Sequence, residues 1–154
     1  NEKGQQRMVL NGADVTDELR TPVMSDYASK VSALGPVREF LLEQQRELAT
    51  RYDVVMDGRD IGTVVLPNAS VKIFLTASAE VRAGRRLAEF RGKGDNVSTL
   101  ESVLEDMKQR DARDSQRAVA PLKQADDAQL LDTSDLSIEE AVTAIKQIIK
   151  EKLA

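Results

Sequence analysis

The sequence has 154 residues, of which 41% are hydrophobic and 31% charged, and this favours one folded domain with at most a small subdomain. A net charge of −4 argues against a general binder of nucleic acid or acidic membranes. The absence of Cys and His excludes disulfides, thiolate chemistry, a Ser-His-Asp triad and an ordinary zinc site. No segment approaches the roughly 20 apolar residues of a membrane span, and no signal-peptide pattern is present, so we expect a cytoplasmic protein.

The first part of the chain is predicted to form a hairpin and two helices. The Asn-Gly pair at residues 11–12 is a strong signal for a two-residue turn, so residues 6–15 are a candidate β-hairpin. A Thr-Pro pair predicts a helix over residues 22–34 with Thr21 as its N-cap, because proline suits the first helical position. A second helix is expected over residues 36–49, where apolar residues recur at helical spacing.

The rest of the chain is predicted to alternate strands with helices. Short apolar runs predict strands over residues 53–57, 71–75 and 129–132. Helices are expected over residues 79–91, 99–117 and from 138 to near the end, capped by Ser78, Ser98 with Glu101, and Ser137 with Glu140. Strands separated by helices favour a parallel α/β sheet. Three strands are few for a doubly wound domain, so the sheet looks incomplete.

Three charged residues follow the first of these predicted strands. The stretch Y-D-V-V-M-D-G-R-D-I-G, residues 52–62, ends its apolar run at Asp57 and continues with Arg59 and Asp60. Open α/β sheets bind ligands at the carboxyl ends of their strands, so these side chains lie where such a fold has its chemistry. By itself the stretch fits equally well a strand and turn whose charges are simply solvated.

A second charged cluster lies in the predicted helix before Pro121. At roughly 100° per residue, Arg110, Arg113, Asp114 and Arg117 share one helix face. Arginine offers a rigid fork of donors that matches phosphate oxygens in pairs, whereas a solvated face with intrahelical ion pairs is the alternative. Taken together, the two clusters favour a pocket for a phosphorylated ligand. Phosphoryl transfer needs positioning and charge neutralisation, which a chain without His and Cys can supply.

Three motifs resemble those of a known family: D-G-R-D-I-G-T-V-V at residues 57–65, R-D-A-R-D-S-Q-R-A-V-A-P-L at 110–122, and L-L-D-T at 130–133. They are similar to bacterial cytidylate kinases, essentially over the whole chain. The resemblance implies a P-loop nucleoside monophosphate kinase, an α/β fold whose parallel sheet has helices on both faces and is incomplete here. It also implies transfer of the γ-phosphoryl group of ATP to CMP or dCMP with Mg²⁺.

The resemblance further implies an organisation of the chain. Residues 1–49 would be a small CMP-binding insertion with the hairpin and helices. Residues 50–154 would be the remainder of the core kinase domain, with a lid over residues 82–117. The partners would be CMP or dCMP and ATP, without nucleic acid or membrane, and the full-length protein would be a monomer.

Roles for individual residues come from the resemblance as well. The residues that would hydrogen-bond the cytosine ring are Ser29, Arg38 and Asp60. The catalytic cations that would hold the CMP phosphate are Arg59 and Arg110, with Arg117 nearby. Asp114 would meet the ribose hydroxyls, and Asp57 would hold Mg²⁺ through water. The residues that would contact ATP from the lid are Arg82 and Arg86.

The sequence departs from the family in one respect. Such kinases carry G-x-x-x-x-G-K-[ST], whose amides and lysine cradle the ATP phosphates; here the Gly92-Lys93 pair has Leu87 where the first glycine would stand. We therefore expect the chain to be the C-terminal portion of a longer kinase and to show no turnover alone in a coupled ADP-release assay. Two alternatives are a module that binds CMP without transferring phosphate and a different P-loop kinase. A calorimetric preference for CMP over UMP would separate the binding module from an inert fragment.

Overall fold

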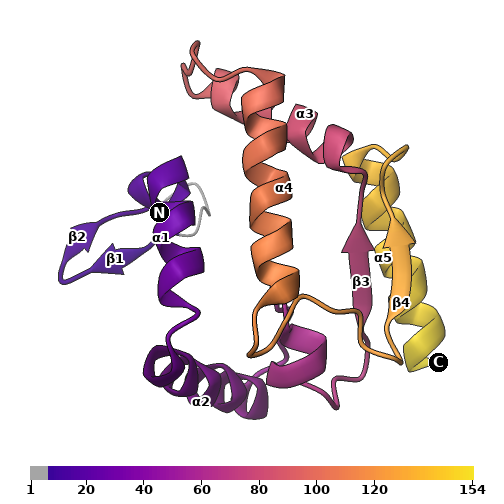
Figure 1. Cartoon of the computed structure of the whole chain (residues 1–154). Helices are drawn as coiled ribbons and strands as arrows, with labels where there is room; N and C mark the ends of the chain where they lie inside the picture. The colour runs from indigo at the N-terminus through magenta and orange to yellow at the C-terminus, as the bar shows by residue number, and fades with distance from the viewer. Residues whose placement is uncertain (1–6) are drawn as a thin grey trace. The chain divides into compact units, whose positions relative to one another are not determined.

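The computed structural model describes residues 7–154 and shows two compact units, divided between Arg51 and Tyr52 (Figure 1). The first unit holds a hairpin and two helices. The second holds two parallel strands and three helices. The division lies two residues after the one expected between residues 49 and 50.

The predicted hairpin is present in the first unit. Strands β1 (Val9–Leu10) and β2 (Ala13–Asp14) pair antiparallel. The turn between them has positive φ angles at Asn11 (49°) and Gly12 (83°), which is the backbone that a two-residue turn of this hand requires. The prediction is confirmed over the described residues; its first residue, Gln6, lies outside them.

Two helices complete the first unit. Helix α1 (Pro22–Val31) begins as predicted, with the Thr21 hydroxyl accepting from the Met24 N–H at 3.3 Å. It ends three residues before the predicted end, because tight bonds between residues three apart, such as Leu34 N–H to the Val31 carbonyl at 3.1 Å, satisfy its last carbonyls. Helix α2 (Gly35–Arg51) follows, slightly longer than predicted. A short 3₁₀ helix before α1, Glu18–Arg20, was not predicted.

The strand predicted over residues 53–57 is not formed. A strand needs a neighbour to pair with its N–H and C=O groups, and the sheets among residues 7–154 are β1–β2 and β3–β4 alone. Val54 is 39% exposed and Val55 is fully exposed. The run at residues 53–57 has the apolar composition of a buried strand. A strand also needs hydrogen bonds to a neighbouring strand that lies elsewhere in the sequence, and the local pattern does not report this. The chain next forms a single π-helical turn, η2 (Ile61–Val65).

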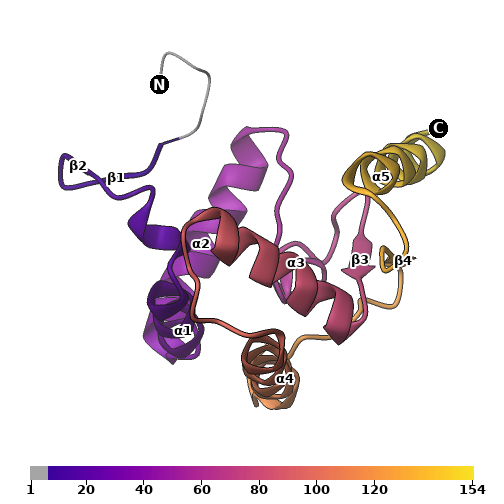
Figure 2. The ribbon, with the colours of Figure 1, turned by 90° about the horizontal axis from the view of Figure 1, so that it is seen from above.

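The second unit is built on a parallel strand pair, which confirms the predicted strand direction. Strand β3 (Ile73–Thr76) pairs with β4 (Gln129–Asp132) in register from end to end. Helices α3 (Ala79–Gly92) and α4 (Leu100–Gln116) pack together, and α5 (Ile138–Leu153) follows β4. Figure 2 shows α4 and α5 on opposite sides of the two strands.

Two helix starts in this unit are confirmed. The Ser78 hydroxyl accepts from the Val81 N–H at 3.2 Å and begins α3. Ser137 and Glu140 form a reciprocal capping box at α5, with Glu140 N–H donating to the Ser137 hydroxyl at 3.2 Å and Ser137 N–H donating to the Glu140 carboxylate at 2.8 Å. Each cap satisfies N–H groups that the helix itself leaves unpaired.

The predicted cap of α4 is wrong by one residue. The capping box is formed by Thr99 and Ser102 rather than by Ser98 and Glu101. The Ser98 hydroxyl instead donates to the Asp95 carboxylate at 2.6 Å, and the same carboxylate accepts the Ser98 N–H at 3.0 Å. Asp95 thus holds Ser98 in the loop, so the helix starts one residue later.

The core of the second unit is small. Its buried apolar residues are Val65, Ala77, Ala83, Val103, Ala120 and Ile148. Leu75 on β3 and Leu130 on β4 are each 55% exposed. Leu75 is paired with Leu131 and Leu130 with Phe74, so the two exposed leucines lie on opposite faces and both faces of the strand pair stay partly open. Within residues 7–154, no helix has the length and apolar character needed to cross a membrane.

Candidate phosphate-binding site

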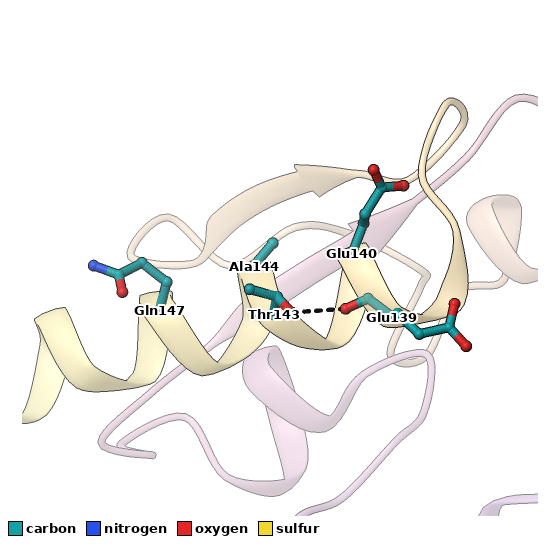
Figure 3. Close-up of a pocket in the computed structure, with 5 residues that line it drawn as sticks. All are labelled: Glu139, Glu140, Thr143, Ala144 and Gln147. Carbon is teal, nitrogen blue, oxygen red and sulfur yellow. Dashed lines mark hydrogen bonds between the residues drawn. The ribbon is translucent and has the colours of Figure 1, made fainter.

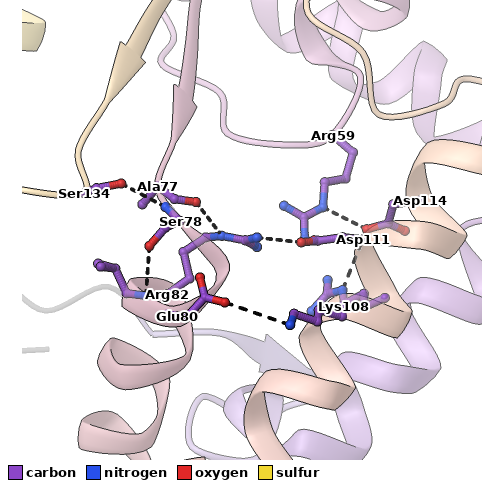
Figure 4. Close-up of polar contacts among 11 residues, drawn as sticks. Arg59, Ala77, Ser78, Glu80, Arg82, Lys108, Asp111, Asp114 and Ser134 are labelled. Carbon is purple, nitrogen blue, oxygen red and sulfur yellow. Dashed lines mark hydrogen bonds and ion pairs between the residues drawn. The ribbon is translucent and has the colours of Figure 1, made fainter. Parts of the chain in front are cut away.

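The buried carboxylate of Asp114 joins two arginines. Asp114 lies on α4 and is only 4% exposed. Its Oδ2 accepts from Arg59 Nε at 2.9 Å (Figure 4). Arg110 Nε lies 3.8 Å from the same oxygen. Arg110 stands one helical turn before Asp114, whereas Arg59 comes from the loop before η2. We call Arg59, Arg110 and Asp114 the arginine cluster.

The arginine cluster has an excess of positive charge. Burial lowers the pKa of Arg110 below its usual value, and the nearby Arg59 guanidinium lowers it further, while Asp114 opposes both effects. The Arg110 Nε is buried and has no hydrogen-bond partner among the described residues. A buried donor without a partner costs free energy. An anion with oxygen acceptors would supply that partner and balance the charge.

A second ion pair lies close by in sequence, between Arg117 and Asp60. Arg117 follows α4 with an extended backbone, and its Nε donates to the Ala120 carbonyl at 2.5 Å. Its Nη2 lies 3.8 Å from Asp60 Oδ1 and, within the described part of the chain, finds no hydrogen-bond partner. The Arg117 and Asp60 side chains are 15% and 12% exposed. This group therefore offers a second buried donor.

The predicted helix face is only partly formed. Arg110 and Asp114 share it, but Arg117 is the residue that ends the helix, so its direction is set by the following loop. Arg113 is exposed, while its neighbour Asp114 is buried. The idealised 100° spacing held for the body of the helix and failed at its end, where the backbone leaves helical geometry.

Asp57 lies exposed at the start of the same segment as Arg59. Gly58 separates them, and a Cβ there would lie 2.9 Å from Ile61 Cγ1, so only glycine fits without a shift. In the described chain, no group of three acidic residues could hold a metal ion. Mg²⁺ often takes one or two protein carboxylates and completes its shell with water and substrate phosphates. A single carboxylate fits Mg²⁺ on those terms, with the nucleotide supplying the remaining oxygens.

The two arginines expected to contact ATP are both engaged by the protein. Arg82 Nη2 pairs with Asp111 at 2.6 Å, and Arg82 Nε donates to the Ala77 carbonyl at 3.0 Å (Figure 4). Arg86 pairs with Glu89 at 2.8 Å, and its guanidinium lies 4.6 Å from the centre of the Phe90 ring. Asp111 and Ala77 were not singled out in the sequence, because only tertiary packing brings α4 to the start of α3.

Arg85 was also not singled out, although it lies between these two arginines. It donates to the Thr133 carbonyl at 2.6 Å, to the Thr133 hydroxyl at 3.2 Å and to the Leu136 carbonyl at 3.2 Å. It thereby ties α3 to the loop after β4. No signal in the sequence separates Arg85 from the other arginines of this helix.

Ser29 and Arg38 meet at one turn of the first unit. Arg38 Nη1 on α2 donates to the Ser32 carbonyl at 3.3 Å, and the Ser32 hydroxyl donates to the Ser29 carbonyl on α1 at 3.0 Å. The structure thus places these two residues on either side of Ser32. Asp60, the third residue expected to contact the base, belongs to the other unit.

A shallow hollow lies along α5 and is lined by Glu139, Glu140, Thr143, Ala144 and Gln147 (Figure 3). The Thr143 hydroxyl donates to the Glu139 carbonyl at 2.8 Å. None of the residues expected to bind nucleotide lines this hollow. Its two carboxylates would repel a phosphate group, so the arginine cluster remains the candidate site.

The comparison with family models decides the membership of the chain. A family model described as cytidylate kinase matches residues 2–151. The chain belongs to the cytidylate kinase family. The resemblance drawn from the motifs is therefore confirmed. Membership implies the P-loop nucleoside monophosphate kinase fold, and the described residues show mixed α/β structure with one parallel and one antiparallel two-stranded sheet.

Individual relatives agree with this membership. A cytidylate kinase of Lactobacillus johnsonii is 50% identical over 151 residues, covering 98% of this chain and 65% of that protein. Cytidylate kinases of Clostridium botulinum and Thermosipho melanesiensis are 51% and 53% identical over 143 residues, covering 93% of this chain and 65% of each protein. The chain thus spans 65% of the length of these three relatives.

Proposed function

We propose that the intact protein transfers the γ-phosphoryl group of ATP to CMP or dCMP, that residues 1–154 alone show no turnover, and that the arginine cluster binds the phosphate of the acceptor nucleotide. The observation that carries this proposal is the buried Arg110 Nε, which has no hydrogen-bond partner among the described residues. It lies beside a second arginine and a single carboxylate. A phosphate group has the charge and the acceptor oxygens that such a cluster lacks.

Each member of the cluster has a distinct part in phosphate binding. Asp114 accepts one donor of Arg59 at 2.9 Å, which fixes the plane of that guanidinium and leaves its terminal amino groups to donate to phosphate oxygens. Arg110 supplies its buried Nε. Two guanidinium groups and one carboxylate carry one net positive charge, which the phosphate neutralises. Arg117, with a buried Nη2, is the third cation near the transferred group.

The base would be read by Ser29, Arg38 and Asp60. The carboxylate of Asp60 accepts hydrogen bonds only, so it suits the exocyclic amino group of cytosine and disfavours the carbonyl that uracil presents at that position. A hydroxyl and a guanidinium suit the carbonyl and ring nitrogen of cytosine. This division of donors and acceptors supports a preference for CMP over UMP.

Asp114 would also meet the ribose hydroxyls. Both of its ion-pair contacts use Oδ2, and the residue is 4% exposed. A ribose hydroxyl would therefore approach the other oxygen, Oδ1, while Oδ2 keeps the two arginines in place for the phosphate. Because Asp114 is buried, neighbouring side chains would have to move to admit the sugar.

The ATP half of the reaction would use Asp57 and the residues of α3. Asp57 would hold Mg²⁺ through water, and the ion would neutralise phosphate oxygens of the nucleotide. Arg82 and Arg86 would reach ATP only after leaving Asp111 and Glu89, their partners at 2.6 Å and 2.8 Å. We propose residues 82–117 as the lid that makes this exchange, and residues 1–49 as the CMP-binding insertion.

The test is phosphoryl transfer by the intact protein from ATP to CMP, dCMP, UMP and AMP in turn. Replacing Arg110 by Met should lower kcat/KM for CMP by about 100-fold or more, the usual loss when one donor to a developing charge is removed. Arg51, exposed at the end of α2, is the matched control, and Arg51→Met should leave the rate unchanged. A wild-type protein that does not phosphorylate CMP in preference to UMP and AMP would contradict the proposal.

A further inference from the structure

Lys72 is a buried lysine that binds two loops of the second unit. It lies immediately before β3, and its side chain is only 7% exposed. Its ammonium group donates to the Pro67 carbonyl and lies 2.7 Å and 2.6 Å from the two carboxylate oxygens of Asp127. Lysine is seldom buried without a partner. This one therefore joins the loop after η2 to the loop before β4.

The aliphatic stem of Lys72 has a contact of its own. It packs against Gly62, where an added Cβ would lie 3.3 Å from Lys72 Cδ and 3.7 Å from Lys72 Cγ. A side chain at position 62 would press directly on this stem. Lysine stems commonly cover apolar surface in this way while the ammonium group keeps polar partners. Lys72 thus contacts η2 near its start, at Gly62, and the chain just past its end, at Pro67.

The turn η2 starts on a residue of the candidate site. The carbonyl of Asp60 accepts from the N–H groups of Val64 at 2.9 Å and Val65 at 3.2 Å, and Leu66 N–H donates to the Ile61 carbonyl at 2.7 Å. Single π-helical turns are rare and frequently occur at functional sites. The backbone position of Arg59 and Asp60 therefore depends on a turn that Lys72 holds near its start and just past its end.

We propose that Lys72 is a positioning residue for the segment of Arg59 and Asp60. Its stem holds Gly62, its ammonium group holds the Pro67 carbonyl, and Asp127 completes the anchor. Through η2 this anchor fixes the backbone at Asp60 and, next to it, the guanidinium that pairs with Asp114. The predicted effect of Lys72 on CMP binding rests on the proposed function, whereas its predicted effect on the backbone at Arg59 and Asp60 does not.

The first test replaces Lys72 by Met in the intact protein, which keeps an apolar stem and removes the ammonium group. Hydrogen exchange of the Val64, Val65 and Leu66 amides should become faster by about 5-fold or more, while the amides of α5 stay unchanged. The Kd for CMP should rise by about 2- to 30-fold, the range for residues that act through a neighbour. The exposed Lys123 is the control, and Lys123→Met should change neither quantity.

Each outcome of this test decides the proposal. Unchanged exchange at η2, or equally faster exchange in η2 and α5, would overturn it, because Lys72 would then be neutral or simply important for overall stability. Faster exchange at η2 with an unchanged Kd for CMP would also overturn it. A wild-type protein that does not bind CMP would overturn the proposed function, and the exchange data would still show whether Lys72 holds the segment.

A second test examines the contact between Gly62 and Lys72. Gly62→Ala should speed exchange of the η2 amides, because its Cβ meets the Lys72 stem at 3.3 Å. The same change should have a smaller effect in a Lys72→Ala background, where the stem is absent. Coupling of this kind is the expected mark of residues in contact. Strictly additive effects would contradict the contact and, with it, the proposed route from Lys72 to Asp60.

Discussion

Replacement of Asp114 by Ala tests the electrostatic description of the arginine cluster. Removing one partner of a fully buried ion pair usually costs about 3–5 kcal/mol. Here Asp114 is 4% exposed, but the Arg59 and Arg110 side chains are 40% and 39% exposed, so water can partly replace the carboxylate. We expect the free energy of unfolding to fall by about 2 kcal/mol. For a chain of this size that lowers Tm by about 4–8 °C.

The assay is urea unfolding of the intact protein followed by far-ultraviolet circular dichroism. Asp114→Asn should cost about half as much as Asp114→Ala, because the amide oxygen still accepts from Arg59 while the charge is lost. Asp106, exposed on the same helix, provides the control, and Asp106→Ala should stay within about 0.5 kcal/mol of the wild type. If Asp114→Ala were no more destabilising than Asp106→Ala, the carboxylate would not be holding the two arginines.

The same variant also tests the affinity of the cluster for anions. Without Asp114, the charges of Arg59 and Arg110 are no longer balanced from within the protein. Inorganic phosphate should therefore raise the Tm of Asp114→Ala more than it raises that of the wild type, by preferential binding to the folded state. Chloride at equal ionic strength serves as the control for screening. Equal responses to phosphate and chloride would argue against a phosphate site.

Three further predictions concern caps, acid stability and base recognition. Thr99→Ala should lower the free energy of unfolding by about 1 kcal/mol in urea unfolding, because it removes the observed cap of α4. A larger loss with Ser98→Ala would instead favour Ser98, the cap predicted from the sequence. Hydrogen bonds from the Ser137 N–H and side chain hold the pKa of Glu140 below its usual value of 4.5. The contribution of this carboxylate to folding stability is therefore present above pH 4.5 and is lost as the pH falls below it. The Tm difference between wild type and Glu140→Gln should shrink at acidic pH, and a constant difference would contradict this. Asp60→Asn should reduce the preference for CMP over UMP by about 10-fold in kcat/KM, the value of one discriminating hydrogen bond, and an unchanged ratio would remove Asp60 from base recognition.

The sequence by itself determined the features that depend on local hydrogen bonds and on periodicity. The Asn11–Gly12 turn needs only backbone that these two residues adopt readily. The helix starts at Thr21, Ser78 and Ser137 need a side-chain acceptor within three residues. Family membership also followed from the motifs, because they are long and contiguous. All of these signals lie within short stretches of chain.

Tertiary structure decided the features that join distant parts of the chain. The stretch at residues 53–57 has the composition of a strand but no pairing neighbour among residues 7–154. Asp114 was expected from the sequence to serve a ligand, yet it is buried against Arg59, 55 residues away. In the sequence, Lys72 is simply one residue of the strand predicted over residues 71–75. In the structure its ammonium group contacts Asp127, also 55 residues away. Burial and ion pairing depend on which surfaces meet after folding, and no local pattern encodes that choice.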